Sequence, residues 1–403
     1  MIKTIKSKKV MSWYLFDFGI SSYPTLILTF FYGAFYANTI ATSPLVGTSN
    51  WGFAISISSI LTFLLLSFLL IQGRQYFRNV SSGFFLFFFY LLIFSTCLLC
   101  FFGEGSNEFY PLIVIIVSFI SFEITTLFYN VCLYKVSKKD QGFVSNLGWA
   151  FGYLGGLLSL LIIYLLIIWT KESNFLFKGI SVFLLIGPLV GLWTFIFGSF
   201  LFKELKTVYF EIPDLLKFYE NIKKQKLTRF LFSYFFFNNG VISIFAFASL
   251  FASFLFKFTE SEILFLGVFI NLFGILGCLF AGYYENRIGS EKSVIICSLI
   301  LFVLSFSLYF IESRSLFWMI AMLIGFFIGP IQALSRAVIV KKINAKNQLA
   351  AFSFYSVLGN ICAILGPLII SLVIDLNESI RIGVLGIPIF FLISVVPYIK
   401  TNV

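Results

Sequence analysis

Residues 51–71 read WGFAISISSILTFLLLSFLLI, a stretch without a single charged side chain. A helix of about 20 residues, rising 1.5 Å per residue, crosses the roughly 30 Å hydrocarbon core of a bilayer. Such a helix satisfies its backbone hydrogen bonds within the segment, so it can cross a region that contains no water. This stretch therefore predicts a transmembrane helix.

Similar stretches recur along the whole chain. Of its 403 residues, 60% are hydrophobic and only 11% are charged, whereas an ordinary soluble domain carries about 25% charged residues. The apolar stretches lack the alternating ten-residue pattern of an outer-membrane barrel. We predict an all-α membrane protein with twelve transmembrane helices, near residues 13–37, 51–71, 83–103, 109–134, 144–169, 179–202, 229–256, 262–284, 293–311, 316–340, 348–374 and 380–399.

The distribution of basic residues fixes the expected topology. If the N-terminus is cytoplasmic, 23 of the 28 Lys and Arg residues fall on the cytoplasmic side and five on the outer side. This asymmetry follows the positive-inside rule, and one missed span would invert every later loop. We expect both termini in the cytoplasm. The net charge of +11 then reflects topology and not nucleic-acid binding. The apolar run after the first lysines is too long for a signal peptide, so we expect it to be the first span.

A hydrophilic stretch and internal similarity divide the chain into halves. Residues 203–228 are rich in charge and predict a cytoplasmic linker between residues 1–202 and 229–403. The Leu-Gly pairs at Gly148 and Gly155 recur 211 residues later. We predict two pseudo-symmetric six-helix bundles, an arrangement that places a transport site between repeats near the membrane midplane.

Polar residues inside the spans are the candidates for that site, because burying them in lipid is costly. Glu123 lies in the middle of the fourth span, and Thr126 and Asn130 follow on the same helical face. One interpretation is a site for a substrate amine or a proton. The alternative is an interhelical hydrogen bond with a structural role.

Other polar residues occupy comparable depths. Asp17 lies in the first span near the cytoplasmic interface, where it could serve structure, gating or substrate contact. Amides and tyrosines in the second half can bind a zwitterion or hold helices together. The candidates of this kind are Asn238, Asn239, Asn271, Gln332, Tyr355 and Asn360.

Several function classes are disfavoured. The chain has no histidine, and its six cysteines all lie in apolar segments, so we expect neither a metal nor a catalytic triad. There is no G-x-x-x-x-G-K-[ST] motif for ATP. We expect a monomeric protein that is not an enzyme and needs no cofactor. Its expected partners are a small-molecule substrate, the lipid bilayer and H⁺ as a coupling ion.

Residues 282–292, GYYENRIGSEK, resemble the G-x-x-x-D-R-x-G-x-x-[RK] loop of major facilitators. Gly282, Arg287 and Gly289 match it, while Asn286 stands at the acidic position. The corresponding loop of the first half retains only Gly73 and Arg78. The resemblance implies coupling or gating roles for these residues.

Longer stretches resemble the UMF1 branch of that superfamily, the bacterial relatives of the Atg22-like vacuolar amino-acid effluxers. Residues 13–21, WYLFDFGIS, are similar to the family's W-x-x-Y-D-W-A-N-S. Residues 144–156, VSNLGWAFGYLGG, are similar to V-S-x-x-G-W-A-x-G-Y-x-G-G. Shorter matches are FNNG at 237–240, QALSR at 332–336, FSFY at 352–355 and LGP at 365–367. Among these, Arg336 is a further gating candidate.

The resemblance implies a major facilitator fold and export of amino acids or related metabolites by alternating access, across a bacterial inner membrane. We also expect proton coupling. The chain departs from the family pattern at Ile20, Asn239 and Asn286, where relatives carry Asn, Asp and Asp. Two alternatives stay open. One is a broad-range drug or metabolite exporter, and the other is a non-transporting sensor or assembly protein on the same fold.

Overall fold

The protein is described here by a computed structural model. It describes residues 7–71, 79–173, 182–204, 209–211, 218, 220, 222–223 and 227–399. Gly73 and Arg78, two of the predicted gating residues, lie outside this part of the chain, as does most of the predicted linker.

Twelve helical segments of the described chain are long and apolar enough to cross a bilayer, which confirms the predicted number of spans. The first span contains two α-helical and two π-helical segments: α2 (Lys8–Ile20), η1 (Tyr23–Phe30), α3 (Tyr32–Phe35) and η2 (Tyr36–Ile40). The other spans of the first half are α4 (Pro44–Ile71), α6 (Ser82–Leu98) with η3 (Leu99–Phe101), α7 (Phe109–Val136), α8 (Gln141–Ser173) and α9 (Val182–Glu204). Those of the second half are α11 (Leu227–Phe256), α12 (Glu260–Ile288), α13 (Ser290–Ser307) with η4 (Leu308–Phe310), α14 (Arg314–Lys342), η5 (Ala345–Asn347) with α15 (Gln348–Asn377), and α16 (Ile380–Val384) with α17 (Gly386–Ile399).

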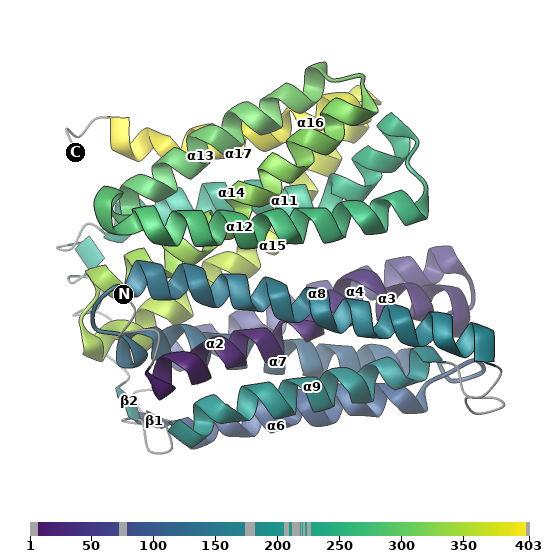
Figure 1. The fold of residues 1–403 in the computed structure, drawn as a ribbon, viewed down its shortest axis with the longest axis horizontal. Helices are drawn as coiled ribbons and strands as arrows, with labels where there is room; N and C mark the ends of the chain where they lie inside the picture. Colours follow the sequence, from purple (N-terminus) through teal and green to yellow (C-terminus); the bar gives the residue numbers. More distant parts are fainter. Residues whose placement is uncertain are drawn as a thin grey trace.

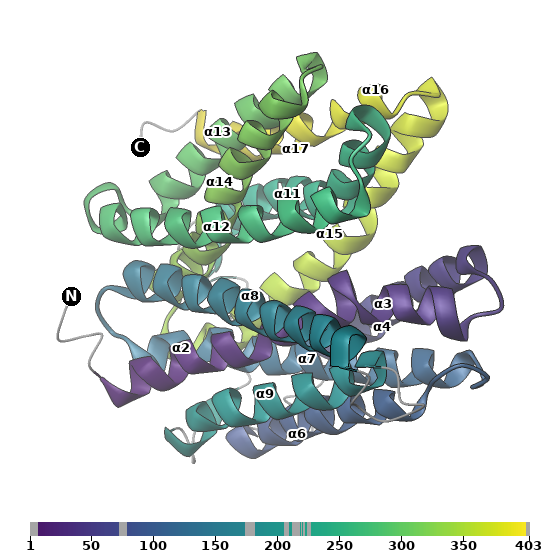
Figure 2. The ribbon, with the colours of Figure 1, turned by 45° about the vertical axis from the view of Figure 1, so that its right-hand side comes forward.

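The helices form two six-helix bundles that lie side by side (Figures 1 and 2), as predicted. The first bundle contains α2 to α9, and the second contains α11 to α17. They meet where α8 packs on α12 and α14, and where α4 and α7 pack on α15. The chain enters α2 and leaves α17 at the same end of the molecule, which we call the terminal end (Figure 1).

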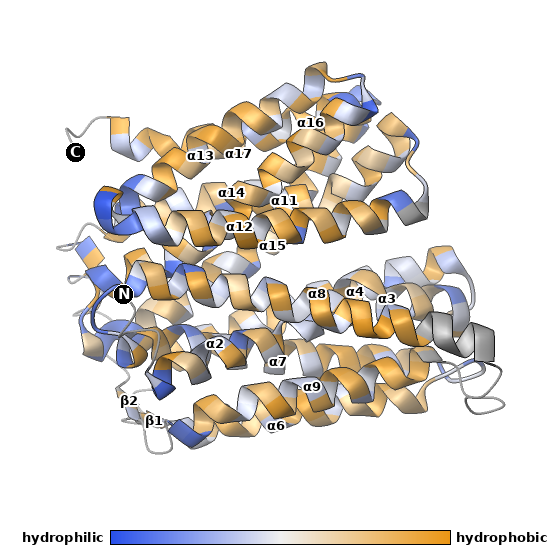
Figure 3. Cartoon of the chain, in the orientation of Figure 1, coloured by the Kyte–Doolittle hydropathy of each residue, from blue (hydrophilic) through white to orange (hydrophobic). Residues whose placement is uncertain are grey.

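Hydrophobic residues cover the length of the helices, and hydrophilic residues gather at the two ends of the molecule (Figure 3). Large apolar side chains point outward along the bundles, including Leu64, Phe87 and Leu192, each more than half exposed. In water such a surface would drive aggregation, whereas lipid tails solvate it. The expected bilayer environment therefore agrees with the outer surface of the fold.

Close helix packing depends on glycine at particular positions. A Cβ atom on Gly155 of α8 would lie 2.0 Å from the carbonyl oxygen of Phe18 in α2. A Cβ atom on Gly277 of α12 would lie 1.8 Å from the carbonyl oxygen of Phe326 in α14. Small residues let membrane helices approach backbone to backbone. Gly155, which the sequence singles out, thus holds the helices of the first bundle together.

A short two-stranded sheet is the β-structure of the described residues. Strand β1 (Asn79–Ser81) pairs antiparallel with β2 (Tyr209–Glu211), and Val80 lies opposite Phe210. The buried ring of Phe210 packs edge-on against Phe85 and Phe128. This contact attaches the beginning of the hydrophilic stretch to the first bundle. Hydropathy does not predict it, because the strands are only three residues long.

Candidate functional site

A cavity of about 450 Å³ lies between the two bundles, and helices from both line it. Its walls contain most of the residues that the sequence predicts for the site: Asp17, Glu123, Thr126, Asn130, Asn238, Asn271, Gln332, Arg336, Tyr355 and Asn360. Asn239 is the exception among the predicted substrate contacts. Its side chain is buried between α11 and α15, where Nδ2 donates to the carbonyl oxygen of Phe235 at 2.7 Å and contacts Sγ of Cys362 at 3.1 Å.

Glu123 lies in α7 and faces this cavity. Its Oε2 accepts a hydrogen bond from Nδ2 of Asn360 in α15 at 3.5 Å, so the contact joins the two bundles. Within the described residues, Glu123 makes no ion pair. Thr126 lines the same wall one turn further, and its buried hydroxyl has no hydrogen-bond partner there. The polar stripe expected along this helix is therefore part of the cavity wall.

The opposite wall comes from the second bundle. Gln332 of α14 donates from Nε2 to Oδ1 of Asn238 in α11 at 3.0 Å, which links two helices of that bundle. The rings of Tyr234 and Tyr355 stack with their centroids 4.0 Å apart. Asn271 of α12 donates to the carbonyl oxygen of Gly267 in its own helix at 2.8 Å. Amide and phenol groups thus face a carboxylate across the cavity.

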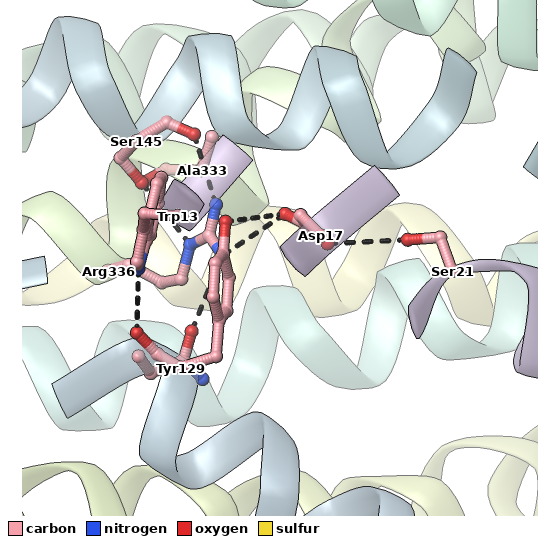
Figure 4. A network of polar contacts seen from close by, with 8 residues as sticks. Trp13, Asp17, Ser21, Tyr129, Ser145, Ala333 and Arg336 are labelled. Carbon is pink, nitrogen blue, oxygen red and sulfur yellow. Dashed lines mark hydrogen bonds and ion pairs between the residues drawn. The ribbon is translucent and has the colours of Figure 1, made fainter. Parts of the chain in front are cut away.

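Arg336 of α14 reaches out of its own bundle and into the first one (Figure 4). Its Nε donates to Oγ of Ser145 at 3.2 Å, and Nη2 donates to the carbonyl oxygen of Ser145 at 3.0 Å. Nη1 donates to Oδ1 of Asn130 at 3.4 Å and lies 3.7 Å from Oδ2 of Asp17. The side chain is 2% exposed. A buried cation therefore has its counterion in the other bundle.

Aromatic rings complete the surroundings of this guanidinium. Its Cζ lies 4.7 Å from the ring centroid of Trp149, 5.0 Å from that of Tyr129 and 5.2 Å from that of Trp13. The Trp13 and Tyr129 rings stack at 4.2 Å, and Trp13 Nε1 donates to the Tyr129 carbonyl oxygen at 2.8 Å. Cation–π contacts of this kind contribute about 0.5–2 kcal/mol each, and more when desolvated. The rings therefore lower the free-energy cost of burying the guanidinium away from water.

Asp17 is held from three sides. The Tyr129 hydroxyl donates to its Oδ2 at 2.7 Å, and the Ser21 hydroxyl donates to its Oδ1 at 3.3 Å (Figure 4). Together with Arg336 these contacts satisfy the carboxylate, as a buried charge requires. We call Asp17, Tyr129, Trp13, Trp149, Ser145, Asn130 and Arg336 the Arg336 junction. It forms the wall of the cavity toward the terminal end, since Ser145 is close to the first residue of α8 and Arg336 is close to the last residue of α14.

The last turn of α12 carries a different acid beside the position where the motif expects one. Asn286 and Arg287 are exposed, and the Arg287 guanidinium lies over the rings of Tyr283 and Tyr284 at 5.8 and 6.0 Å. The adjacent Glu285 is fully buried and forms an ion pair with Lys341 of α14. One residue along a helix turns a side chain by about 100°, so Glu285 points inward where Asn286 points outward.

Glu285 also faces the first bundle, at the beginning of α8. A Cβ atom on Gly142 would lie 2.0 Å from Cδ of Glu285 and would clash with it. A carboxylate near the first turn of a helix interacts favourably with the helix dipole. Gly282 packs nearby against Asn146 and Phe143 of α8, while Gly289 has a positive φ of 88° that permits the turn into α13. Glu285 is thus a second contact between the bundles on the terminal side, and the sequence motif alone does not reveal it.

The chain is similar to proteins of one superfamily. Residues 134–403 match the family described as vacuole effluxer Atg22 like. The uncharacterized MFS-type transporter YxiO of Bacillus subtilis (strain 168) is 26% identical over 413 residues, which cover 97% of this chain and 94% of that protein. MFS denotes the major facilitator superfamily.

Solved structures of MFS transporters share the fold. The human organic anion transporter MFSD10 (TETRAN) superimposes with a TM-score of 0.73 at 13% identity, covering 97% of this chain and 98% of that one. FucP in its outward conformation superimposes with a TM-score of 0.70 at 13% identity, covering 99% and 100%. The proton:xylose symporter XylE superimposes with a TM-score of 0.66 at 11% identity, covering 98% and 94%. On its sequence and its fold, the chain belongs to the Atg22-like vacuole effluxer family and is an MFS-type transporter.

Proposed function

We propose that the protein exports amino acids or related small metabolites across a bacterial inner membrane, coupled to protons, by alternating access. The observation that carries the proposal is the cavity between the bundles, in which Glu123 faces the amides and phenols of the second bundle. Both bundles contribute polar groups, so rocking one against the other would expose the same groups to each side in turn. The basic residues support a cytoplasmic terminal end, and the XylE symporter is a proton-coupled protein of the same fold.

In this proposal Glu123 alternates between a proton and the amino group of the substrate. An ionised carboxylate in a membrane interior is costly unless a cation accompanies it. Glu123 has an amide partner and no ion pair among the described residues. A proton or a substrate ammonium group supplies the missing positive charge. Thr126 and Asn130 on the same helix, with Asn238, Asn271, Gln332, Tyr355 and Asn360 on the other wall, then hold the remaining polar groups of the substrate.

The Arg336 junction and Glu285 act as a gate on the terminal side. The Arg336 junction joins a charge of one bundle to polar groups of the other, and Glu285 packs against Gly142 at the beginning of α8. Opening that side would break these contacts and expose the charges to water. The gate would therefore close the cavity toward the cytoplasm while the site is open to the outside.

The experiment compares wild type, Glu123→Gln and the matched control Glu104→Gln, an exposed carboxylate, in proteoliposomes. Exchange of labelled against unlabelled amino acids measures binding and turnover without net proton flux. Accumulation driven by an imposed pH gradient measures coupling. We expect Glu123→Gln to abolish gradient-driven accumulation while the control retains it.

The exchange assay separates the two roles of Glu123. Loss of accumulation with intact exchange identifies a proton site, and loss of both in a correctly folded variant identifies a contact with the substrate. Normal accumulation in Glu123→Gln excludes this residue from the mechanism. Absence of exchange with any amino acid in the wild type refutes the proposed substrate class.

A further inference from the structure

A second cavity, of about 350 Å³, lies inside the second bundle at the terminal end. Its walls come from the first turn of α11, the end of α12, the beginning of α13 and the last turns of α14 and α17. It shares no lining residue with the cavity between the bundles. Because helices of a membrane protein end near the headgroup region, this cavity lies at the depth of lipid phosphates.

Four basic side chains line this cavity: Arg229, Lys292, Lys341 and Lys342. The acids that face them are Glu291, which pairs with Lys342 at 2.7 Å, and the buried Glu285, which pairs with Lys341. Lys341 and Lys342 thus each have an acidic partner. Lys292 is exposed and makes no ion pair within the described residues.

The backbone adds to this positive field. Helix α13 has 18 residues, and its N-cap is Gly289, which has no side chain to accept from the first N–H groups. The first turn of a helix leaves N–H groups without partners, and these together with the helix dipole favour an anion. Ser290 of that turn lies in the cavity wall. Cationic side chains and free backbone donors therefore face the same space.

The remaining walls are apolar and open toward lipid. Ile288, Ile295 and Val338 line the cavity, and Ile288 is 40% exposed. Ile399, the last residue of α17, is 73% exposed. Tyr398 contributes a ring over which the Arg229 guanidinium lies at 4.7 Å. An exposed cation, Lys292, beside an exposed apolar side chain, Ile288, matches a phosphate group that carries hydrocarbon chains.

We propose that this cavity binds a phosphoryl anion, the chemistry shared by the headgroup of an anionic phospholipid and by soluble phosphate. Basic pockets between transmembrane helices on the cytoplasmic side are suited to anionic headgroups. The phosphate oxygens accept from Lys292, Lys342 and the first N–H groups of α13. Glu291 competes with the ligand for Lys342 and limits its affinity.

The test is native mass spectrometry of the purified full chain with added phosphatidylglycerol or phosphatidylcholine. The double variant Lys292→Gln/Lys342→Gln removes two cations from the cavity. The control Lys138→Gln/Lys139→Gln removes two exposed cations at the same end of the first bundle. Each cation near the surface changes the affinity about fivefold, so the double variant should bind phosphatidylglycerol about thirtyfold more weakly than wild type. The control should bind it like wild type.

Glu291→Gln provides a readout that misfolding cannot mimic, because it should bind phosphatidylglycerol about fivefold more tightly. A parallel thermal-shift titration with inorganic phosphate, against chloride at equal ionic strength, distinguishes the two sources. Preference for phosphatidylglycerol that phosphate does not displace assigns the site to lipid. Stabilisation by phosphate in wild type but not in the double variant assigns it to a soluble anion. Equal behaviour of wild type, double variant and control in both assays overturns the proposal.

Discussion

Removing the cation of the Arg336 junction should open the terminal side of the transporter. In Arg336→Met the carboxylate of Asp17 stays in the closed junction without its counterion, 3.7 Å from where the guanidinium lay. Only the hydroxyls of Tyr129 and Ser21 still donate to it. When the terminal side opens, water can hydrate this charge. The substitution therefore raises the free energy of the closed state and leaves that of the open state nearly unchanged.

The size of the effect follows from the burial of the pair. Removing one partner of a buried ion pair costs about 3–5 kcal/mol. Two hydroxyl donors remain on Asp17, so the lower figure applies. About 3 kcal/mol corresponds to a change of roughly 150-fold in the ratio of closed to open protein. A protein that is closed in 99% of molecules would become mostly open under such a change.

Adding Asp17→Asn to Arg336→Met removes the uncompensated charge. Because replacing both partners of a buried pair by neutral groups costs much less than removing one, the double variant should return most of the way to the closed state. A variant that merely damages the fold would show the opposite order, with the double worse than the single. This comparison separates gating from general destabilisation.

Spin labels at positions 138 and 286 provide the assay, since Lys138 and Asn286 are exposed at the terminal end of the first and second bundles. The labels are introduced in a background without native cysteines, and pulsed electron resonance measures the distance distribution in nanodiscs. We expect longer distances in Arg336→Met and near wild-type distances in the double variant. Arg287→Met, an exposed cation at the same end, serves as the control. Identical distributions in all four proteins would falsify the assignment of this junction to a gate.

Three further predictions concern the contacts at helix ends. Gly142→Ala should shift the same label distances toward the open form, because its Cβ would lie 2.0 Å from Cδ of Glu285. Glu285→Gln should lower the thermal stability by about 1 kcal/mol, because Lys341 loses its counterion but is 38% exposed and can be hydrated, whereas Asn286→Gln should leave the melting temperature unchanged. The third prediction is a pH effect at the beginning of α12. The pKa of Glu262 lies below its ordinary value there, because its carboxylate accepts from the backbone N–H and the hydroxyl of Thr259 and pairs with the Arg314 guanidinium. This capping contribution is complete above the unfolded pKa and is lost as the pH falls through the lowered one. Amide exchange of the first turn of α12, compared between neutral and acidic pH and corrected for intrinsic rates, should therefore accelerate in wild type more than in Glu262→Gln.

The spans and the polar stripe could be predicted because both are local patterns. Hydropathy over about 20 residues marks a crossing, and a spacing of three and four places Glu123, Thr126 and Asn130 on one face. The partner of Asp17 could not be predicted in this way. Arg336 is distant in sequence, and its role as counterion depends on how the two bundles dock, which one sequence does not specify.

Differences of a single residue between the predicted and the observed positions have another cause. Asn238 and Asn239 are neighbours, yet only Asn238 lines the cavity, and Glu285 is buried where Asn286 is exposed. Adjacent residues on a helix point about 100° apart. The rotation of each helix about its axis decides which neighbour faces inward. In apolar helices with weak amphipathicity, the sequence constrains that rotation poorly.

In the proposed function, the environments of the two carboxylates beside the cavity suit them to different tasks. Asp17 has an arginine and two hydroxyl donors, so its charge is compensated when the terminal side is closed. Glu123 has one amide donor at 3.5 Å and faces the space that a solute would fill. Separating a compensated charge from its partners costs free energy, and this suits Asp17 to a gate. A carboxylate without a cationic partner binds a cation that enters the cavity, and this suits Glu123 to the substrate site. If Asp17 bound the substrate instead, it would have to release Arg336 of the other bundle each time a substrate entered. Substrate binding would then directly open the terminal side. The separation of the two groups instead allows the site to fill before the gate moves, as alternating access requires.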